Sequence, residues 1–283
     1  MTKILDGREL AGFIKERQAA EVRSLRGQGR RPKLVIIRDN DSPVIAKYVE
    51  LKKHYGEDIG VEVEDWLVNG GEDGLKKLQE AVETANKASD VSGIIVQLPL
   101  ADKTGVNKAE KEQTTSEIVQ RIAPEKDVDG LSGKGRFDSA TATAINWLLA
   151  GHNIELAGKK IALVGRGRLV GAPLYKMWTD SGLDVTMLHS GDDLAVLKNF
   201  GVIVTATGVP HLIKTGMIKP GAVVVDAGTA SEDGVLVGDV DEAVRERDDL
   251  GAITPKIGGV GPLTVGVLFE NVIRATKHKN KSS

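Results

Sequence analysis

Cysteine is absent from the 283 residues, which excludes disulfide bonds, thiolate metal ligands and a cysteine nucleophile. An excess of charge is also missing, because the formal net charge is −2 and leaves no broad basic surface for nucleic acid or an anionic membrane. No apolar run approaches the length of a membrane span, and the first residues lack the apolar core of a signal peptide. We therefore expect a cytoplasmic protein with neither nucleic-acid nor membrane partners.

What the sequence does contain is a regular alternation of strand and helix patterns. Hydrophobic residues make up 41% of the chain, and its length suffices for two modest domains. In the first half, strands are predicted at 31–39, 60–68 and 93–100, and helices at 7–27, 46–60, 74–89 and 115–123. A capping box formed by Thr114 and Glu117 marks the start of the last of these helices. The alternation predicts parallel βαβ units.

A stretch rich in glycine and serine, residues 131–140, separates this series from a second one. A helix is predicted at 141–151, and another begins near Val170. Strands of the second series are expected at 161–165, 183–190, 202–208, 222–228 and 251–255, and a helix at 264–276 follows them. The fold class is therefore α/β with two domains.

Glycines at positions 165, 167 and 171 connect the first strand of the second series to its helix. Small residues at such a turn let the backbone approach a pyrophosphate, and the helix N-terminus favours the anion. The spacing is one residue longer than the usual dinucleotide fingerprint and is weak by itself. Its place at the first turn of a βαβ unit favours a nucleotide over a purely structural turn.

The residues after the next strand bear on the identity of that nucleotide. A carboxylate there favours NAD, whereas basic and hydroxyl groups favour NADP. The sequence has His189 followed shortly by Asp192 and Asp193, while Arg166 is available to a 2′-phosphate. These signals conflict. The alternative is that Asp192 or Asp193 caps a helix beginning near Leu194.

Several polar loops end other predicted strands. The turns at 206–210 (ATGVP) and 226–228 (DAG) belong at the carboxyl edge of a parallel sheet, where ligands bind, with ordinary tight turns as the alternative. Gln97 ends an apolar strand, and a buried amide must find hydrogen-bond partners. The glycine-rich loop 255–264 is expected to let backbone approach a ligand, and its Pro262 to determine the entry to the last helix.

Two further features each carry two interpretations. Asp127 and Asp129 lie in a loop beside a glycine, where a turn competes with a calcium-like motif that has too few oxygen ligands. Tyr48 and Lys52 are four residues apart in a predicted helix and so share one face. By helix geometry alone, a packed tyrosine beneath a solvated lysine is the simpler interpretation. The other is an aromatic platform beside a reactive amine.

Six stretches together resemble the bifunctional methylenetetrahydrofolate dehydrogenase/methenyltetrahydrofolate cyclohydrolase family. Each is modest alone, but the set follows the family's order along nearly the whole chain and is highly specific in combination. The stretches are Y-V-x-x-K at 48–52, G-I-I-V-Q-L-P-L at 93–100, P-E-K-D-V-D-G at 124–130, V-G-R-x-x-x-V-G-x-P at 164–173, A-T-G-x-P at 206–210 and G-G-V-G-P-x-T at 258–264.

The resemblance implies a folate-side catalytic domain at 1–140, joined by a returning C-terminal helix at 264–283, and a Rossmann-like NAD(P)-binding domain at 141–263. The active site is expected in the cleft between them. The implied reactions are oxidation of 5,10-methylenetetrahydrofolate and hydrolysis of the methenyl product to 10-formyltetrahydrofolate, in one-carbon metabolism. NADP is the expected cofactor, with NAD as the alternative, and no metal is required. A homodimer formed through the cofactor domains is also implied.

The resemblance also assigns roles by position. Lys52 is expected to be the catalytic amine, hydrogen-bonded by Gln97, while Tyr48 stacks on the folate and Asp129 binds its pterin ring. The expected folate contacts are Tyr48, Gln97, Leu98, Asp129 and Pro262. The expected dinucleotide contacts are Gly165, Arg166, Gly167, Gly171, Ser190, Thr207, Gly208, Gly228 and Thr229.

Physical chemistry agrees with the role of the lysine. With its ordinary pKa of about 10.4, a charged lysine is a poor base. Desolvation and a nearby cationic intermediate both favour the neutral amine. An uncharged glutamine can orient that amine without holding it protonated, as a carboxylate would.

Some positions depart from the family's pattern. Gly167 replaces a serine, and Gly191 and Asp192 replace a basic residue and a threonine. These changes remove donors to a 2′-phosphate and add a negative charge, so a monofunctional NAD-dependent dehydrogenase is one alternative.

The remaining departures concern the folate side. They are Ile45 in place of a serine, Ser139–Ala142 in place of Pro-Cys-Thr-Pro, and Lys256-Ile257 in place of Val-Pro. They give a second alternative from another class, a catalytically weak folate-binding protein. A generic Rossmann dehydrogenase would not explain the pair Tyr48 and Lys52 or the stretches at 93–100 and 124–130.

Overall fold

The computed structural model describes residues 1–68, 73–101, 106–232 and 235–279, and two compact units make up the chain. Unit 1 consists of residues 1–12 and 141–264, and unit 2 of residues 13–140 and 265–283. The sequence placed residues 1–12 with the folate-side domain. They belong to unit 1 because the strand at Lys3–Ile4 pairs with the strand at Ala252–Ile253.

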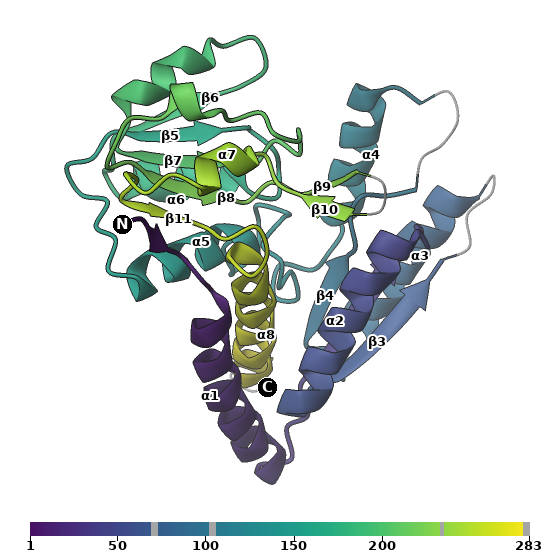
Figure 1. Cartoon of the computed structure of the whole chain (residues 1–283). Coiled ribbons are helices and arrows are strands. Elements are labelled where there is room, and N and C mark those ends of the chain that lie inside the picture. Colours follow the sequence, from purple (N-terminus) through teal and green to yellow (C-terminus); the bar gives the residue numbers. More distant parts are fainter. Residues whose placement is uncertain (69–72, 102–105, 233–234, 280–283) are drawn as a thin grey trace. The chain divides into compact units, whose positions relative to one another are not determined.

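Unit 1 is built on a six-stranded parallel sheet in the order β1-β11-β8-β7-β5-β6 (Figure 1). The strands are β1 (Lys3–Ile4), β5 (Ile161–Val164), β6 (Val185–Leu188), β7 (Val202–Thr205), β8 (Val223–Asp226) and β11 (Ala252–Ile253). The central strands β5 and β7 are continuous buried runs, as expected where helices cover both faces of a parallel sheet. Strand order reverses at β5, which makes its carboxyl end a topological switch point.

Short elements complete unit 1. The helices are α5 (Ala140–Gly151), α6 (Gly171–Asp180), α7 (Glu242–Arg245) and the 3-10 turns η1 (Leu194–Asn199) and η2 (Thr215–Met217). Strands β9 (Ala230–Glu232) and β10 (Val235–Val237) form an antiparallel pair. The sequence analysis did not predict β1, η2, α7 or this pair, because segments of two to four residues are too short to show a hydrophobic period.

Unit 2 has a three-stranded parallel sheet in the order β3-β2-β4, with helices packed on it. The strands are β2 (Lys33–Arg38), β3 (Glu62–Leu67) and β4 (Gly93–Val96), and the helices are α1 (Arg8–Gly27), α2 (Pro43–Ile59), α3 (Gly74–Lys87), α4 (Lys108–Val119) and α8 (Val260–His278). One core cluster joins β2 and β4 to α3 and α4, with Val35, Leu78, Val82, Ile94 and Ile118 all at most 1% exposed.

The C-terminal part of α8 returns to unit 2 and runs beside α1 (Figure 1). The ring of Phe269 stacks on Tyr55 with centroids 5.0 Å apart, and Gln18 on α1 donates to the carbonyl of Gly266 at 2.8 Å. Asn271, which is 4% exposed, donates to the carbonyl of Val128 at 2.9 Å. Helix α8 therefore holds the loop that follows α4.

Three predicted elements have a boundary that is wrong by four residues or more. Helix α4 begins at Lys108, because the capping box is formed by Asn107 and Glu110 and not by Thr114 and Glu117. The strand predicted at 93–100 ends at Val96. Helix α8 begins at Val260, four residues before the predicted start, so that Pro262 lies in its first turn.

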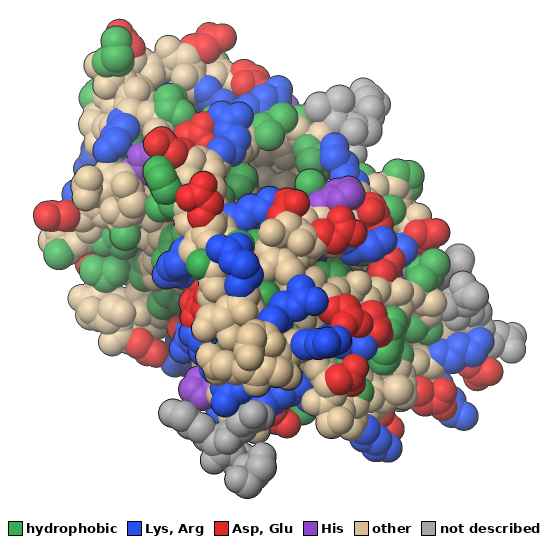
Figure 2. Space-filling view, turned by 90° about the horizontal axis from the view of Figure 1, so that it is seen from below, with side chains coloured by type: hydrophobic (Ala, Val, Ile, Leu, Met, Phe, Trp, Pro, Cys, Tyr) green, Lys and Arg blue, Asp and Glu red, His purple; other side chains and the backbone are tan. Residues whose placement is uncertain are grey.

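The surface mixes charges of both signs. On the face seen in Figure 2, basic and acidic side chains are interspersed, in keeping with the net charge of −2. Within the described ranges, none of the helices combines the length and apolar character that a membrane span requires.

Replacing Asn271 by leucine is expected to lower the free energy of unfolding by about 2 kcal/mol, because the buried carbonyl of Val128 loses its donor. Urea denaturation measures the change. The control Asn199→Leu, at an exposed position, is expected to cost less than about 0.5 kcal/mol. Equal losses in the two variants would contradict the assigned role of Asn271.

Candidate active site

Helix α2 carries Tyr48 and Lys52, the pair for which the sequence left two interpretations. It starts with a proline at its first position and ends at Gly60, whose φ of 82° is the left-handed conformation typical of a helix C-cap. Its buried face consists of Ile45, Val49, Gly56 and Ile59. Tyr48 and Lys52 lie on the margin of that face, and both are half-buried.

The ammonium of Lys52 donates a hydrogen bond of 2.7 Å to Oε1 of Gln97, the residue that follows β4. The amide of Gln97 is oriented from both sides, because its Nε2 donates to the carbonyl of Leu98 at 2.9 Å and its backbone N–H donates to Ile37 at 2.8 Å. Burial lowers the pKa of Lys52, and the charge of Asp129 acts in the opposite direction without outweighing it. Lys52 is thus not the solvated surface lysine of the simpler interpretation.

Two buried charges shape the loop that carries Asp129. Lys126 donates to the carbonyls of Ala85, Asn86 and Ala88 at 2.7–3.0 Å, so it caps the C-terminal end of α3. Asp127 is fully buried and accepts hydrogen bonds from three successive backbone N–H groups, those of residues 130–132, and from the Ser132 hydroxyl. The turn interpretation is therefore confirmed for Asp127. The sequence analysis missed the anchoring role of Lys126, because nothing in the sequence distinguishes this buried lysine from the exposed Glu125 beside it.

Asp129 lies in the same electrostatic environment as Lys52. Burial raises the pKa of this carboxyl to about 6, while the positive charge of Lys52 opposes the rise and Asp127 adds to it. Burial also raises the pKa of the Tyr48 hydroxyl. Unit 2 therefore combines a lysine of lowered pKa, a neutral amide partner and a carboxyl of raised pKa, a combination typical of catalytic sites.

The predicted folate residues fall into two groups. Lys52, Gln97, Leu98 and Asp129 come together in unit 2, with Tyr48 one turn before Lys52 on α2. Pro262 belongs to unit 1, and its folate contact stays a prediction. Within the described ranges, no group of three or more His, Asp or Glu side chains is placed to hold a metal ion.

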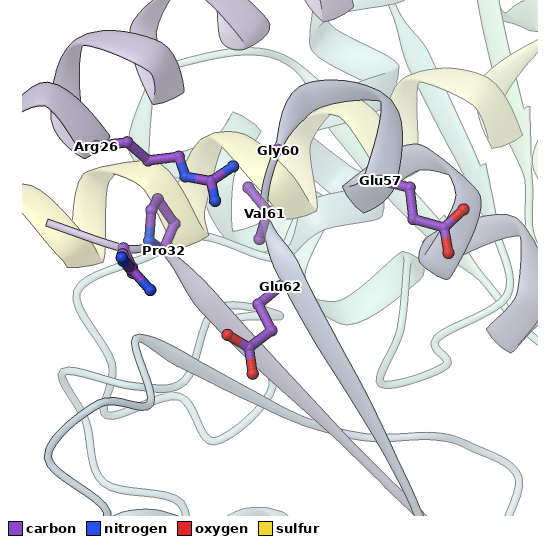
Figure 3. Close-up of a pocket in the computed structure, with 7 residues that line it drawn as sticks. Arg26, Pro32, Glu57, Gly60, Val61 and Glu62 are labelled. Atoms are coloured by element: carbon purple, nitrogen blue, oxygen red, sulfur yellow. The ribbon is translucent and has the colours of Figure 1, made fainter.

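A separate surface hollow of about 350 Å³ lies where α2 meets β3 (Figure 3). Arg26, Glu57, Gly60 and Glu62 are among the residues that line it. It contains none of the predicted site residues.

In unit 1, the glycine loop after β5 has the geometry that a phosphate-binding turn requires. Gly165 has a φ of 104°, and a Cβ there would lie 2.6 Å from the carbonyl oxygen of Ala206. A Cβ on Gly171, the first residue of α6, would lie 1.8 Å from the carbonyl oxygen of Gly165. The helix N-terminus is thus brought directly against the end of β5, while Arg166 and Gly167 are exposed.

The other predicted dinucleotide residues follow the neighbouring strands. Ser190 comes after β6, Thr207 and Gly208 after β7, and Gly228 and Thr229 after β8. These strands are parallel and adjacent, so their carboxyl ends share one edge of the sheet with the glycine loop. A Cβ on Gly208 would lie 3.5 Å from the Thr229 carbonyl oxygen, so the last two loops are neighbours. The residues present fit a bound dinucleotide along this edge.

The two acidic residues after β6 both have local structural partners. Asp193 caps η1 by accepting the Ala195 N–H at 2.9 Å, which confirms the capping interpretation for this residue. Asp192 accepts the backbone N–H of His189 at 2.7 Å. Its carboxylate is therefore held beside the end of β6.

Some of the positions that depart from the family's pattern are buried, and others are exposed. Ile45 is 3% exposed on the buried face of α2, and Ser139 and Ala142 are buried around the start of α5. Lys256 forms an ion pair with Glu242, whereas Ile257 is 70% exposed.

The sheet and glycine loop of unit 1, together with the second α/β unit, place the chain in the class of two-domain dinucleotide-binding proteins. Two family models extend this assignment. Residues 5–129 match "Tetrahydrofolate dehydrogenase/cyclohydrolase, catalytic domain", and residues 139–280 match "Tetrahydrofolate dehydrogenase/cyclohydrolase, NAD(P)-binding domain". The chain belongs to the tetrahydrofolate dehydrogenase/cyclohydrolase family, as the sequence motifs predicted.

Individual relatives agree with this. The chain is 38% identical over 294 residues to the "Bifunctional protein FolD" of Lactobacillus delbrueckii subsp. bulgaricus, covering 99% of each chain. Among solved structures, the bifunctional enzyme FolD from Campylobacter jejuni matches with a TM-score of 0.88 and 31% identity, over 98% of this chain and 99% of that one. The Trypanosoma brucei dehydrogenase-cyclohydrolase, solved with NADP and an inhibitor, matches with a TM-score of 0.85 and 30% identity, over 98% and 97%.

Replacing Asp129 by asparagine is expected to stabilise the protein above neutral pH. The folded-state pKa of about 6 lies above the unfolded value. The contribution of the Asp129 carboxyl to the free energy of unfolding is therefore largest below about pH 4. That contribution is lost as the pH rises through about 6. After allowance for partial exposure, the gain of the variant at pH 8 is about 1–2 kcal/mol.

Urea denaturation at pH 4 and pH 8 measures this difference. The exposed Asp138→Asn, in the same connection between the loop and α5, serves as the control and is expected to show no such pH-dependent gain. A variant of Asp129 that is less stable than wild type at pH 8 would contradict the desolvated carboxyl.

Proposed function

We propose that this protein oxidises 5,10-methylenetetrahydrofolate with NADP and hydrolyses the resulting methenyl derivative to 10-formyltetrahydrofolate. One observation carries the proposal. In a chain of this family, the amine of Lys52 is desolvated and hydrogen-bonded at 2.7 Å to the neutral amide of Gln97. The similar solved enzymes from Campylobacter jejuni and Trypanosoma brucei are both described as methylenetetrahydrofolate dehydrogenase/cyclohydrolases.

A dinucleotide held by these loops would supply the hydride acceptor for the oxidation of the methylene carbon. The chain contributes alignment and exclusion of water, which dominate such a step. The glycine loop 165–171 binds the pyrophosphate, and the loops after β7 and β8 orient the remaining half of the dinucleotide. Tyr48 stacks on the folate, and Asp129 binds its pterin ring.

In the hydrolysis step Lys52 acts on the methenyl derivative. Burial lowers the pKa of its ammonium, and the positive charge of the methenyl group lowers it further. The neutral amine can then accept a proton from the attacking water. Gln97 keeps the amine in place through its carbonyl oxygen. Because Gln97 is uncharged, it does not stabilise the ammonium form as a carboxylate would.

The same family membership supports three further parts of the proposal. They are a homodimer formed through the NAD(P)-binding domains, a cytoplasmic location, and folate contacts through Leu98 and Pro262. Sedimentation velocity tests the first of these, because a monomer at all protein concentrations would contradict it.

A second candidate is an NAD-dependent enzyme. The observation that favours it is the carboxylate of Asp192, held beside the end of β6 where a 2′-phosphate of NADP is expected. A spectrophotometric assay with methylenetetrahydrofolate and each dinucleotide decides between the two. Tight folate binding without turnover in either assay would instead support a folate-binding protein.

Replacing Lys52 by methionine is expected to reduce hydrolysis of methenyltetrahydrofolate by at least about 100-fold, because the proton acceptor is lost. The matched control is Lys53→Met on the same helix, where Lys53 pairs with Glu50 at the surface. The control is expected to keep hydrolysis within about twofold of wild type. Wild-type hydrolysis in Lys52→Met would rule out the role of this lysine.

Replacing Asp192 by asparagine is expected to raise kcat/KM for NADP about three- to tenfold and to change that for NAD little. The substitution removes a negative charge but keeps an acceptor for the His189 N–H. Asp193→Asn is the control, since asparagine still caps η1. Equal changes with both dinucleotides would show that Asp192 does not face the 2′ position.

A further inference from the structure

A fully buried carboxylate, that of Asp239, lies beneath the loops at the ends of β7 and β8. Its Oδ2 accepts two hydrogen bonds of 2.6 Å, one from the hydroxyl of Thr205 and one from the backbone N–H of Thr207. Thr205 is the last residue of β7, and Thr207 begins the Thr-Gly turn assigned to the dinucleotide. Asp239 therefore determines the conformation of that turn from below.

The carboxylate belongs to a buried group that also contains Asp226 and Arg245. Asp226, at the end of β8, accepts the backbone N–H of Asp239 at 3.1 Å and the guanidinium of Arg245 at 2.6 Å. The pKa of Asp226 is raised mainly by burial, and the charge of Asp239 also raises it. Arg245 is thus the ion-pair partner of Asp226.

One oxygen of Asp239 has no hydrogen-bond partner. Its Oδ1 is buried and unpaired among the described residues, as is Nε of Arg245. The other oxygen, Oδ2, already accepts two donors. A buried acceptor left in this way is costly, so a functional explanation is warranted.

The unpaired oxygen lies directly against a dinucleotide loop. A Cβ on Gly228 would lie 2.0 Å from Oδ1 of Asp239, so any other residue would displace one of the two. Only glycine lets the backbone after β8 pack this closely on the carboxylate. The negative charge is therefore separated from the ligand side of the loop by backbone alone.

The position of this charge relates it to one half of the dinucleotide. The strand order places β6 on one side of β5, and β7 and β8 on the other. In a sheet of this topology the dinucleotide crosses the switch point, with its adenosine over the β5–β6 side. The nicotinamide half then lies over the loops after β7 and β8. That ring is a cation when oxidised and neutral when reduced.

We propose that Asp239 is a positioning residue for the nicotinamide half of the site, and that its buried charge favours the oxidised over the reduced dinucleotide. The proposal rests on the dinucleotide binding of the proposed function but on none of its folate chemistry. In general, a unit charge about 12 Å from a cation, at an effective dielectric constant of about 20, changes the affinity for that cation about tenfold.

The test measures dissociation constants of the oxidised and the reduced dinucleotide, by calorimetry or fluorescence, for wild type and Asp239→Asn. The ratio of the reduced to the oxidised constant is expected to fall about tenfold in the variant. A purely structural role would weaken both forms by the same factor, so an unchanged ratio would overturn the proposal. Asp241→Asn, at the partly exposed cap of α7 where the carboxylate pairs with Lys214, is the control and should leave the ratio nearly unchanged.

Thr205→Val keeps the test decisive if Asp239→Asn does not fold. This change removes one donor to Asp239 and preserves the charge. The ratio of the reduced to the oxidised dissociation constant is therefore expected to stay the same or to rise. A fall in this ratio would overturn the proposal. Wild-type protein that binds neither form would contradict the proposed function itself, which separates the two failures.

Discussion

The hydrogen bond between Lys52 and Gln97 is the interaction on which the proposed chemistry depends. It joins α2 to the end of β4 and places an amine in a desolvated setting without giving it a carboxylate partner. Burial outweighs the opposing charge of Asp129, so the pKa of the ammonium is lowered. The same geometry with glutamate at position 97 would hold the lysine protonated and would remove the base.

Buried charges recur as the means of positioning the loops of both units. Lys126 and Asp127 anchor the loop before Asp129 through backbone carbonyl and N–H groups. Asp239 does the same for the turn after β7. Each of these groups would be costly if unpaired, so each strongly favours one loop conformation. The reactive side chains can then remain exposed to ligand while their backbone is rigid.

Much of this organisation could be predicted from the sequence, because long elements carry a clear period. Helices α1, α2 and α3 and strands β2, β5 and β7 lie close to their predicted ranges. The start of α4 could not be predicted, since two capping boxes of similar quality compete. Among the site residues, the motifs identified Lys52 and Gln97, and the structure brings them into contact. Asp239 escaped notice because its partners, Thr205 and Thr207, lie more than 30 residues away, and only the fold brings them together.

The most direct test of the account is a titration of Lys52 itself. Carbon-13 NMR of lysine side chains, with the Lys52 signal assigned by its absence in Lys52→Met, reports the pKa of this one amine. The account predicts a value clearly below the ordinary 10.4 or so, and a further fall when Asp129 is replaced by asparagine. A pKa at or above the ordinary value would contradict the desolvated amine on which the proposed hydrolysis depends.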